Sequence, residues 1–99
     1  KHGEAVGLGL VCAAHAAAQL RLCEKDLVAR VRGLLQLCGL PTAVEGLPSS
    51  EAVISRMAHD KKVASGKLRL VLPVKGGKVR VRDDVPAKVI AAAIDAVRA

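Results

Sequence analysis

The chain contains no Phe, Tyr or Trp, although 52% of its 99 residues are hydrophobic. Its core must therefore be filled by Leu, Val and Ala, and such small side chains require close contacts between neighbouring helices. Independent domains cluster near about 100–150 residues, so we expect residues 1–99 to form a single domain. The absence of aromatic residues favours the interpretation that the chain is a piece of a larger protein. The alternative explanation is a genome biased toward Ala and Val.

Positive charge is concentrated in the second half of the chain. The formal net charge is +7, and residues 61–82 hold eight Lys or Arg and no acid. Such a block attracts anions, including phosphorylated metabolites, nucleic acid and lipid headgroups. Nucleic-acid binders add aromatic stacking platforms or a recognisable motif, and this sequence has neither. We therefore expect a small phosphorylated ligand or a solvated basic face, and no nucleic acid.

The thiols and the longest apolar segment both indicate a cytoplasmic protein. Cys12, Cys23 and Cys38 are odd in number, and their spacing matches no zinc or redox motif, so we predict reduced thiols. The longest uncharged run, 5–20, has 16 residues. A bilayer span needs about 20 apolar residues, so no membrane partner is expected.

Apolar residues at helical spacing predict two helices in the first half, at 3–22 and 25–38. The first is apolar nearly all round, which is typical of a central helix with neighbours on several sides. Gly39 supplies the glycine that ends the second. On this second helix the cations predicted to lie outside are Lys25, Arg30 and Arg32, and the predicted buried residues are Val28, Val31, Leu34, Leu35 and Cys38.

A third helix is predicted to begin at Ser49 or Ser50, either of which can cap it. It carries Asp60-Lys61-Lys62 at its C-terminal end, where the helix dipole favours cations. Ser65-Gly66 then breaks it. Its predicted buried stripe is Val53, Ile54, Met57 and Ala58.

Strands at 67–74 and 78–82 are predicted to form a β-hairpin with a two-residue turn at Gly76-Gly77. In this register the apolar pairs share one face of the hairpin, and most of the cations share the other. The predicted pairs are Lys75 with Lys78, Val74 with Val79, Pro73 with Arg80 and Leu72 with Val81.

A last helix is predicted to be capped by Asp83 or Asp84, with Pro86 in its first turn. The element order therefore predicts a mainly α fold with one small β-hairpin at about 67–82. The predicted buried residues of the last helix are Val89, Ile90, Ala93, Ile94 and Val97.

His2 stands at the start of the first predicted helix, where an imidazole can ligate a metal, act as an acid or base, or be solvated. A catalytic zinc site needs about three protein ligands and an open position. His15 lies about 20 Å along the same helix, and His59 has no supporting spacing, so neither completes such a site. If His2 binds a metal, we expect its co-ligands to lie outside this chain.

The chain carries five short motifs, which are His2-Gly3-Glu4-Ala5-Val6, Gly39-Leu40-Pro41, Asp60-Lys61-Lys62, Gly66-Lys67-Leu68-Arg69 and Asp84-Val85-Pro86. In this order they resemble the C-terminal part of the 3-dehydroquinate synthases, which belong to the sugar-phosphate cyclase superfamily. The similarity covers essentially the whole chain. It implies a multihelical C-terminal domain, and the N-terminal NAD-binding domain of the family is expected to be absent from residues 1–99.

The resemblance implies that the whole protein converts 3-deoxy-D-arabino-heptulosonate 7-phosphate to 3-dehydroquinate and phosphate. This lyase reaction belongs to the shikimate pathway, which leads to chorismate and the aromatic amino acids. The resemblance further implies two cofactors, NAD and a divalent metal (Zn or Co), and a cytoplasmic homodimer. The expected partners are the phosphorylated sugar-acid substrate and the missing N-terminal domain.

Three residues receive roles from the resemblance. His2 matches the metal-ligating histidine of the family's His-Gly-Glu-Ala motif. Lys61 and Lys62 match its Asp-Lys-Lys motif, one lysine of which contacts anionic groups of the substrate. Lys62 is favoured, because related cyclases keep Asp-x-Lys and vary the middle residue, and Lys61 stays open. The family's other metal ligands and its NAD-binding segment are missing here, so no catalytic set is complete and no NAD-binding residue is assigned. The 99 residues alone are expected to be inactive and to bind neither cofactor.

Two alternatives remain open from the sequence. One is a sister sugar-phosphate cyclase, such as a 2-deoxy-scyllo-inosose or valiolone-type synthase. The other is a stand-alone basic helical module that binds a partner or nucleic acid through residues 61–82.

Overall fold

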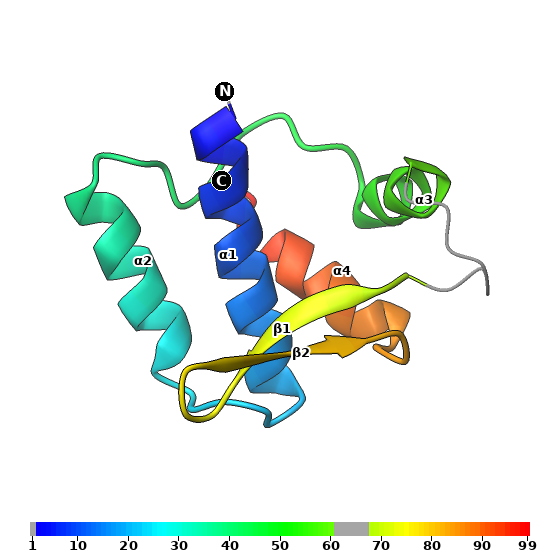
Figure 1. Ribbon diagram of the computed structural model, residues 1–99. Helices are drawn as coiled ribbons and strands as arrows, with labels where there is room; N and C mark the ends of the chain where they lie inside the picture. Colours follow the sequence, from blue (N-terminus) through cyan, green and yellow to red (C-terminus); the bar gives the residue numbers. More distant parts are fainter. Residues whose placement is uncertain (1, 61–67) are drawn as a thin grey trace.

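The computed structural model describes residues 2–60 and 68–99. This part of the chain forms four helices and one two-stranded antiparallel hairpin, which confirms a mainly α fold with a small β-hairpin (Figure 1). The elements are α1 (His2–Gln19), α2 (Leu27–Leu37), α3 (Ser50–Asp60), β1 (Leu70–Val74), β2 (Lys78–Arg82) and α4 (Ala87–Asp95).

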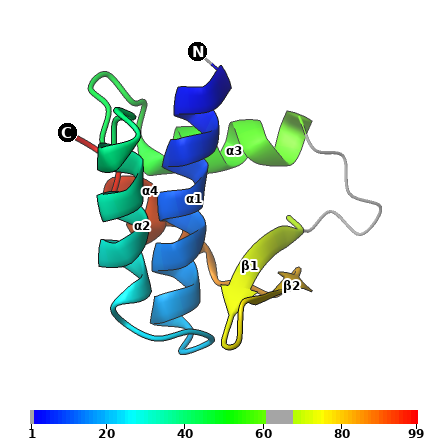
Figure 2. The same ribbon diagram turned by 60° about the vertical axis from the view of Figure 1, so that its left-hand side comes forward.

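Helix α1 is the central element, as its apolar sequence predicts. It packs against α2, α4 and β1, and the ribbon views show it standing between α2 and the hairpin (Figures 1 and 2). Val11 and Ala17 on this helix are 0% exposed. At Gly7 the neighbouring helix comes so close that an added Cβ would lie 3.3 Å from Leu35 Cδ2. Small side chains thus bring the elements together, as a core without aromatic residues requires.

The core consists of two groups of buried residues. The largest fully buried side chains are Leu72 and Val11, one in each group. All five positions predicted to be buried in the last helical segment are buried, which confirms its apolar stripe. They are Val89, Ile90, Ala93, Ile94 and Val97. The first group is Ala16, Ala17, Cys23, Leu72, Val89 and Ala93; the second is Val11, Leu35 and Val97.

Helix α1 ends at Gln19, earlier than the predicted residue 22. Arg21 adopts a positive φ of 60°, and the backbone amides of Leu22 and Arg21 donate to the carbonyls of Ala17 and Ala18. This is the Schellman arrangement, which glycine usually provides. The prediction was wrong here because no glycine marks the turn. The same arrangement ends α2 at Gly39, where the sequence signal is present and the prediction is confirmed.

Several predicted buried positions proved to be exposed. On α2 only Leu35 is buried, whereas Leu34 is 64% exposed and Cys38 is also exposed. Arg32, which was predicted to lie outside, is half-buried and donates from Nη2 to the carbonyl of Ala96 at 2.7 Å. On α3 the predicted stripe is only partly correct. Its half-buried members are Val53, Ile54 and Met57, and its exposed member is Ala58.

The register of the hairpin differs from the prediction by one residue. The loop has three residues, because Lys75 stays outside the ladder and its amide donates to the carbonyl of Leu22 at 3.1 Å. A shift of one residue exchanges the two faces of a strand. The observed pairs are Leu70 with Arg82, Val71 with Val81, Leu72 with Arg80, Pro73 with Val79 and Val74 with Lys78.

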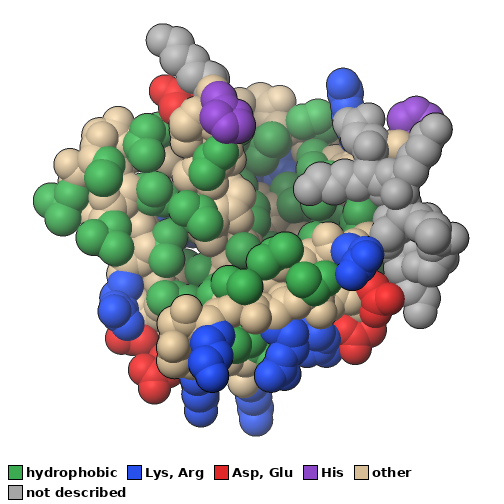
Figure 3. Space-filling view, viewed as in Figure 1, with side chains coloured by type: hydrophobic (Ala, Val, Ile, Leu, Met, Phe, Trp, Pro, Cys, Tyr) green, Lys and Arg blue, Asp and Glu red, His purple; other side chains and the backbone are tan. Residues whose placement is uncertain are grey.

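This register gives the hairpin an exposed apolar face. Val71, Val79 and Val81 are 57%, 67% and 50% exposed. Hydrophobic side chains gather over the hairpin and over α1 and α2, while Lys and Arg lie along the lower rim (Figure 3). The apolar pairs and the cations of β2 thus lie on opposite faces, as predicted, but the members of the faces differ. Leu70, Leu72 and Val74 share the face of the cations, and not that of Val79 and Val81 as predicted.

The remaining sequence expectations concern caps, thiols and membranes. The N-cap of α4 is Pro86, so neither Asp83 nor Asp84 caps it, and Asp84 instead pairs with Arg82. Ser49 caps α3 by accepting from the amide of Ala52 at 3.2 Å.

The three cysteines are free thiols, and burial raises the pKa of Cys12 and Cys23. In the described ranges, no helix is long and apolar enough to cross a membrane.

Two glycines of α1 provide a matched test of close packing. Gly9 is exposed, and an added Cβ would meet no atom within 4 Å, so Gly9→Ala is expected to stabilise the chain by about 0.5–1 kcal/mol through helix propensity. Gly7→Ala is expected to gain less, because Leu35 must move. Urea denaturation followed by circular dichroism measures both, and equal effects would contradict the close contact at Gly7.

Leu72 anchors the hairpin in the core. Leu72→Ala is expected to lower the free energy of unfolding by about 2–5 kcal/mol, because the residue is 2% exposed and leaves a cavity. Its neighbour Val71 is the control: Val71→Ala removes a 57% exposed side chain and is expected to cost less than about 0.5 kcal/mol. Similar losses for both variants, measured by urea denaturation, would show that the register is wrong.

Candidate functional site

His2 is the first residue of α1, and its side chain is exposed. Glu4 lies in the first helical turn, where a carboxylate is stabilised by the positive end of the helix dipole. Among residues 2–60 and 68–99, no group of three or more His, Cys, Asp or Glu side chains is placed to hold a metal ion. The imidazole of His2 is therefore accessible as one ligand, and the described residues do not complete a site around it.

The Asp-Lys-Lys motif begins at the last residue of α3. Asp60 ends this helix, while Lys61 and Lys62 lie outside the described residues. In both ribbon views α3 and the start of α1 lie in the same half of the molecule, opposite the turn of the hairpin (Figures 1 and 2). Within the described ranges α3 packs on α4 and makes no contact with α1. The fold thus brings the start of α1 and α3 to one side without packing them together.

The described cations of the basic block lie elsewhere. Lys75 and Lys78 line a groove of about 460 Å³ between the start of α2 and the hairpin turn, together with Arg30 and Glu24. This groove is at the opposite end of α1 from His2 (Figure 1). The basic residues of the hairpin therefore do not gather around the candidate metal ligand.

The other two histidines are also separate from His2. His15 is half-buried, and its Nδ1 atom is buried without a hydrogen-bond partner. His59 is exposed in the last turn of α3. Neither belongs to a group of three or more His, Cys, Asp or Glu side chains among the described residues that could hold a metal ion.

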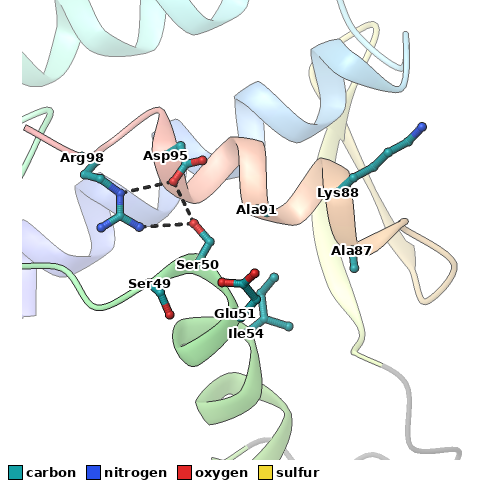
Figure 4. Close-up of a pocket in the computed structure, with 9 residues that line it drawn as sticks. All are labelled: Ser49, Ser50, Glu51, Ile54, Ala87, Lys88, Ala91, Asp95 and Arg98. Atoms are coloured by element: carbon teal, nitrogen blue, oxygen red, sulfur yellow. Dashed lines mark hydrogen bonds and ion pairs between the residues drawn. The ribbon is translucent and has the colours of Figure 1, made fainter.

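A polar network joins the start of α3 to the end of α4 (Figure 4). Ser50 donates its hydroxyl to Asp95 Oδ1 at 2.8 Å. Arg98 donates from Nε to the same carboxylate oxygen at 3.2 Å, from Nη2 to Ser50 Oγ at 3.2 Å and from Nη1 to the carbonyl of Leu47 at 2.9 Å. We call Ser50, Asp95 and Arg98 the α3 clamp.

The α3 clamp lies beside a groove of about 550 Å³ between α3 and α4. The hydrogen bond from Ser50, followed by the hydrogen bond from Arg98, lowers the pKa of Asp95, so its carboxylate stays charged near neutrality. Sequence reasoning missed this network. Its members are 45 and 48 residues apart, and no motif connects a serine at one helix start with charges at another helix end.

The C-terminal segment holds the loop that precedes α3. Val44 forms a parallel bridge with Arg98, in which the Val44 amide donates to the Val97 carbonyl at 2.8 Å and the Ala99 amide donates to the Val44 carbonyl at 3.0 Å. Arg32 on α2 donates to the carbonyl of Ala96 in the same segment. Helices α2, α3 and α4 are thus connected through a few polar contacts at one corner of the molecule.

Comparison with known proteins gives a consistent result. A family model described as 3-dehydroquinate synthase C-terminal matches residues 1–63. The chain is 43% identical over 89 residues to the 3-dehydroquinate synthase of Nostoc punctiforme, covering 90% of this chain and 24% of the relative. It is 42% identical over 97 residues to that of Rhodopirellula baltica, covering 98% and 26%. It is 35% identical over 97 residues to the 3-dehydroquinate synthase of Crocosphaera subtropica, covering 98% of this chain and 27% of the relative.

The chain spans about a quarter of the length of these curated relatives. The part that the family model matches includes His2, Glu4 and the Asp-Lys-Lys motif at 60–62. The family model covers more than half of the 99 residues. The chain therefore belongs to the 3-dehydroquinate synthase C-terminal family.

Proposed function

We propose that the whole protein is a 3-dehydroquinate synthase and that this chain supplies part of its active site. The reaction would convert 3-deoxy-D-arabino-heptulosonate 7-phosphate to 3-dehydroquinate and phosphate. The observation that carries the proposal is the 35–43% identity, over 90–98% of the chain, to the three relatives named above. Each of them bears the name 3-dehydroquinate synthase, which favours this activity over that of a sister sugar-phosphate cyclase.

His2 is proposed as one ligand of a catalytic divalent metal, Zn or Co. Its exposed imidazole at the first residue of α1 fits this role, because nothing in the described structure covers it. The remaining ligands would come from parts of the protein outside this chain. Such a metal supplies Lewis-acid polarisation of the substrate hydroxyl that is oxidised. The contribution of this chain is to hold one imidazole at the end of a rigid, centrally packed helix.

Lys62 is proposed to bind an anionic group of the substrate, with Lys61 as the alternative. A lysine is a compact cation that binds phosphate or carboxylate as a point charge. In the sequence, both lysines follow directly after Asp60, the last residue of α3. The support for this assignment is the Asp-Lys-Lys motif at the end of a helix.

NAD is proposed to bind outside these 99 residues, in a preceding domain, and the chain alone is proposed to be inactive. We further propose a cytoplasmic homodimer for the whole protein. These proposals are supported by the family membership and by the short span of the chain relative to its relatives.

The proposed function is tested in the whole protein by phosphate release from 3-deoxy-D-arabino-heptulosonate 7-phosphate. His2→Ala is expected to lose most of the bound metal and to lower kcat at least about 100-fold, because a catalytic site with three protein ligands loses one of them. Metal analysis and steady-state kinetics measure the two effects. The matched control is His59→Ala, which removes another exposed histidine and is expected to keep its metal.

Normal metal content and activity in His2→Ala would refute the role of His2. Phosphate release from a different sugar phosphate, with none from the named substrate, would assign the protein to a sister cyclase.

The two lysines are distinguished by substrate affinity. Lys62→Ala in the whole protein is expected to raise KM by about 10–100-fold, because a hydrogen bond to a charged group contributes roughly 1.5–3 kcal/mol. Lys61→Ala is expected to change KM less. Lys78→Ala, on the hairpin, is the control and should leave KM unchanged. A larger effect of Lys61→Ala would exchange the two roles, and no effect of either variant would contradict the assignment.

A further inference from the structure

Helices α1 and α2 pack against each other, with Gly7 of α1 next to Leu35 of α2. Near this contact, both helices also carry large apolar side chains that are about half exposed or more. Hydrophobic side chains gather over the two helices on the side seen in Figure 3. We define the α1–α2 face by four of these residues, which are Val6 (48% exposed), Leu10 (52%), Leu34 (64%) and Leu37 (85%).

The part of this face on α1 continues the side of the helix that begins with His2. Residues four apart lie on the same side of a helix, so Val6 and Leu10 follow His2 along one stripe. Glu4 comes two residues after His2 and lies on another side. A helix side in contact with water normally carries polar or charged residues, and a contiguous apolar patch instead marks an interface. The stripe therefore has the composition of a covered surface.

Gly9 supports this interpretation, because nothing in the structure explains it. It lies on the same stripe, it is exposed, and an added Cβ would meet no atom within 4 Å. A glycine inside a helix costs about 1 kcal/mol relative to alanine. Glycine allows another part of a protein to approach a helix backbone closely, as Gly7 does for Leu35 on the inner side. We therefore infer a close neighbour at Gly9 from outside the described residues.

The proposed role of His2 indicates which neighbour this is. The remaining metal ligands are proposed to come from outside this chain, because the described residues supply no such group. Ligands of one ion lie next to one another, so the segment that carries them must come into contact with the start of α1. Val6 lies only about 6 Å further along the helix axis. The segment that approaches His2 is therefore in reach of the α1–α2 face.

The relatives contain enough polypeptide to cover this face. The chain spans 24–27% of their length, so about three quarters of each relative lies outside the matched part. The preceding domain proposed above would be joined to the start of α1, next to the face. A linked partner has an effective concentration on the order of millimolar. This favours the linked domain over a second copy of the chain, which has to be recruited from solution.

We propose that the preceding domain of the same polypeptide covers the α1–α2 face and packs closely against α1 at Gly9. This inference rests on the proposed function, through the role of His2. The proposed contact does not extend to the hairpin turn. Val79 lines the groove there, at the opposite end of α1 from His2 (Figure 1). Because Val79 is also an exposed valine, at 67%, it is a matched control.

Photo-cross-linking in the purified whole protein tests which molecule covers the face. The photoreactive amino acid benzoylphenylalanine replaces Leu10, Leu37 or, as the control, Val79. At Leu10 and Leu37 we expect cross-links within one polypeptide to peptides from outside residues 1–99, identified by mass spectrometry. Their yield is expected to be several-fold higher than at Val79.

The other outcomes of the cross-linking would overturn the proposal. Cross-linked species of twice the mass of the polypeptide would identify a second copy as the occupant of the face. No cross-links at Leu10 and Leu37, or equal yields at all three positions, would show that the face is open to solvent.

A pair of lysine substitutions gives a second readout. Val6→Lys places a charge in the proposed contact, and Val79→Lys places one outside it. Covering an unpaired charge is costly, so Val6→Lys is expected to speed the loss of metal to a chelator at least about tenfold, while Val79→Lys changes it less than about twofold. Both side chains are exposed in this structure, so neither variant disturbs the core. Equal rates in the two variants would contradict the proposal.

The cross-links are measured without turnover, which separates this proposal from the proposed function. Cross-links within one polypeptide, in a protein that releases no phosphate from the named substrate, would overturn the proposed function and support the covered face. The expected activity without these cross-links would overturn the covered face alone.

Discussion

The close packing of α1 against three neighbours is the interaction on which the rest of this structure depends. A core without aromatic side chains has little volume per residue, so the elements must approach closely to exclude water. Val11 and Ala17 on α1 are fully buried, and Gly7 lets Leu35 of α2 come near the helix backbone. The accessible His2 stands at the end of this helix, so a candidate metal ligand is carried by the best-packed element of the fold.

The two parts of the candidate site are held by different forces. The start of α1 is positioned by apolar contacts along the whole helix, whereas α3 depends on hydrogen bonds at its first turn. Apolar burial stabilises strongly and has no direction, while a guanidinium with three acceptors contributes little energy and much orientation. The start of α1 is therefore held mainly by burial, and the start of α3 mainly by polar contacts.

Sequence patterns predicted the elements whose stability is local or strongly periodic. The predictions of the apolar stripe of α4 and of the glycine that ends α2 were both correct, because each signal lies in residues close together in the sequence. Arg21 was missed because a residue with a side chain occupies a turn that usually requires glycine. The hairpin register was wrong because the position of Lys75 depends on a hydrogen bond to Leu22, 53 residues earlier. Likewise, the α3 clamp unites residues that no local signal connects.

The position of Lys75 outside the ladder determines which side chains the hairpin places outward. The three residues between Val74 and Lys78 place three valine side chains outward and set the cations of β2 across from Leu70, Leu72 and Val74. Drawing Lys75 into the ladder would leave a two-residue connection at Gly76-Gly77 and shift β2 by one residue, so that its valines turn inward and its cations turn outward. The backbone hydrogen bond from Lys75 to Leu22 therefore separates an apolar outer surface from a cationic one, with no change in the composition of either strand.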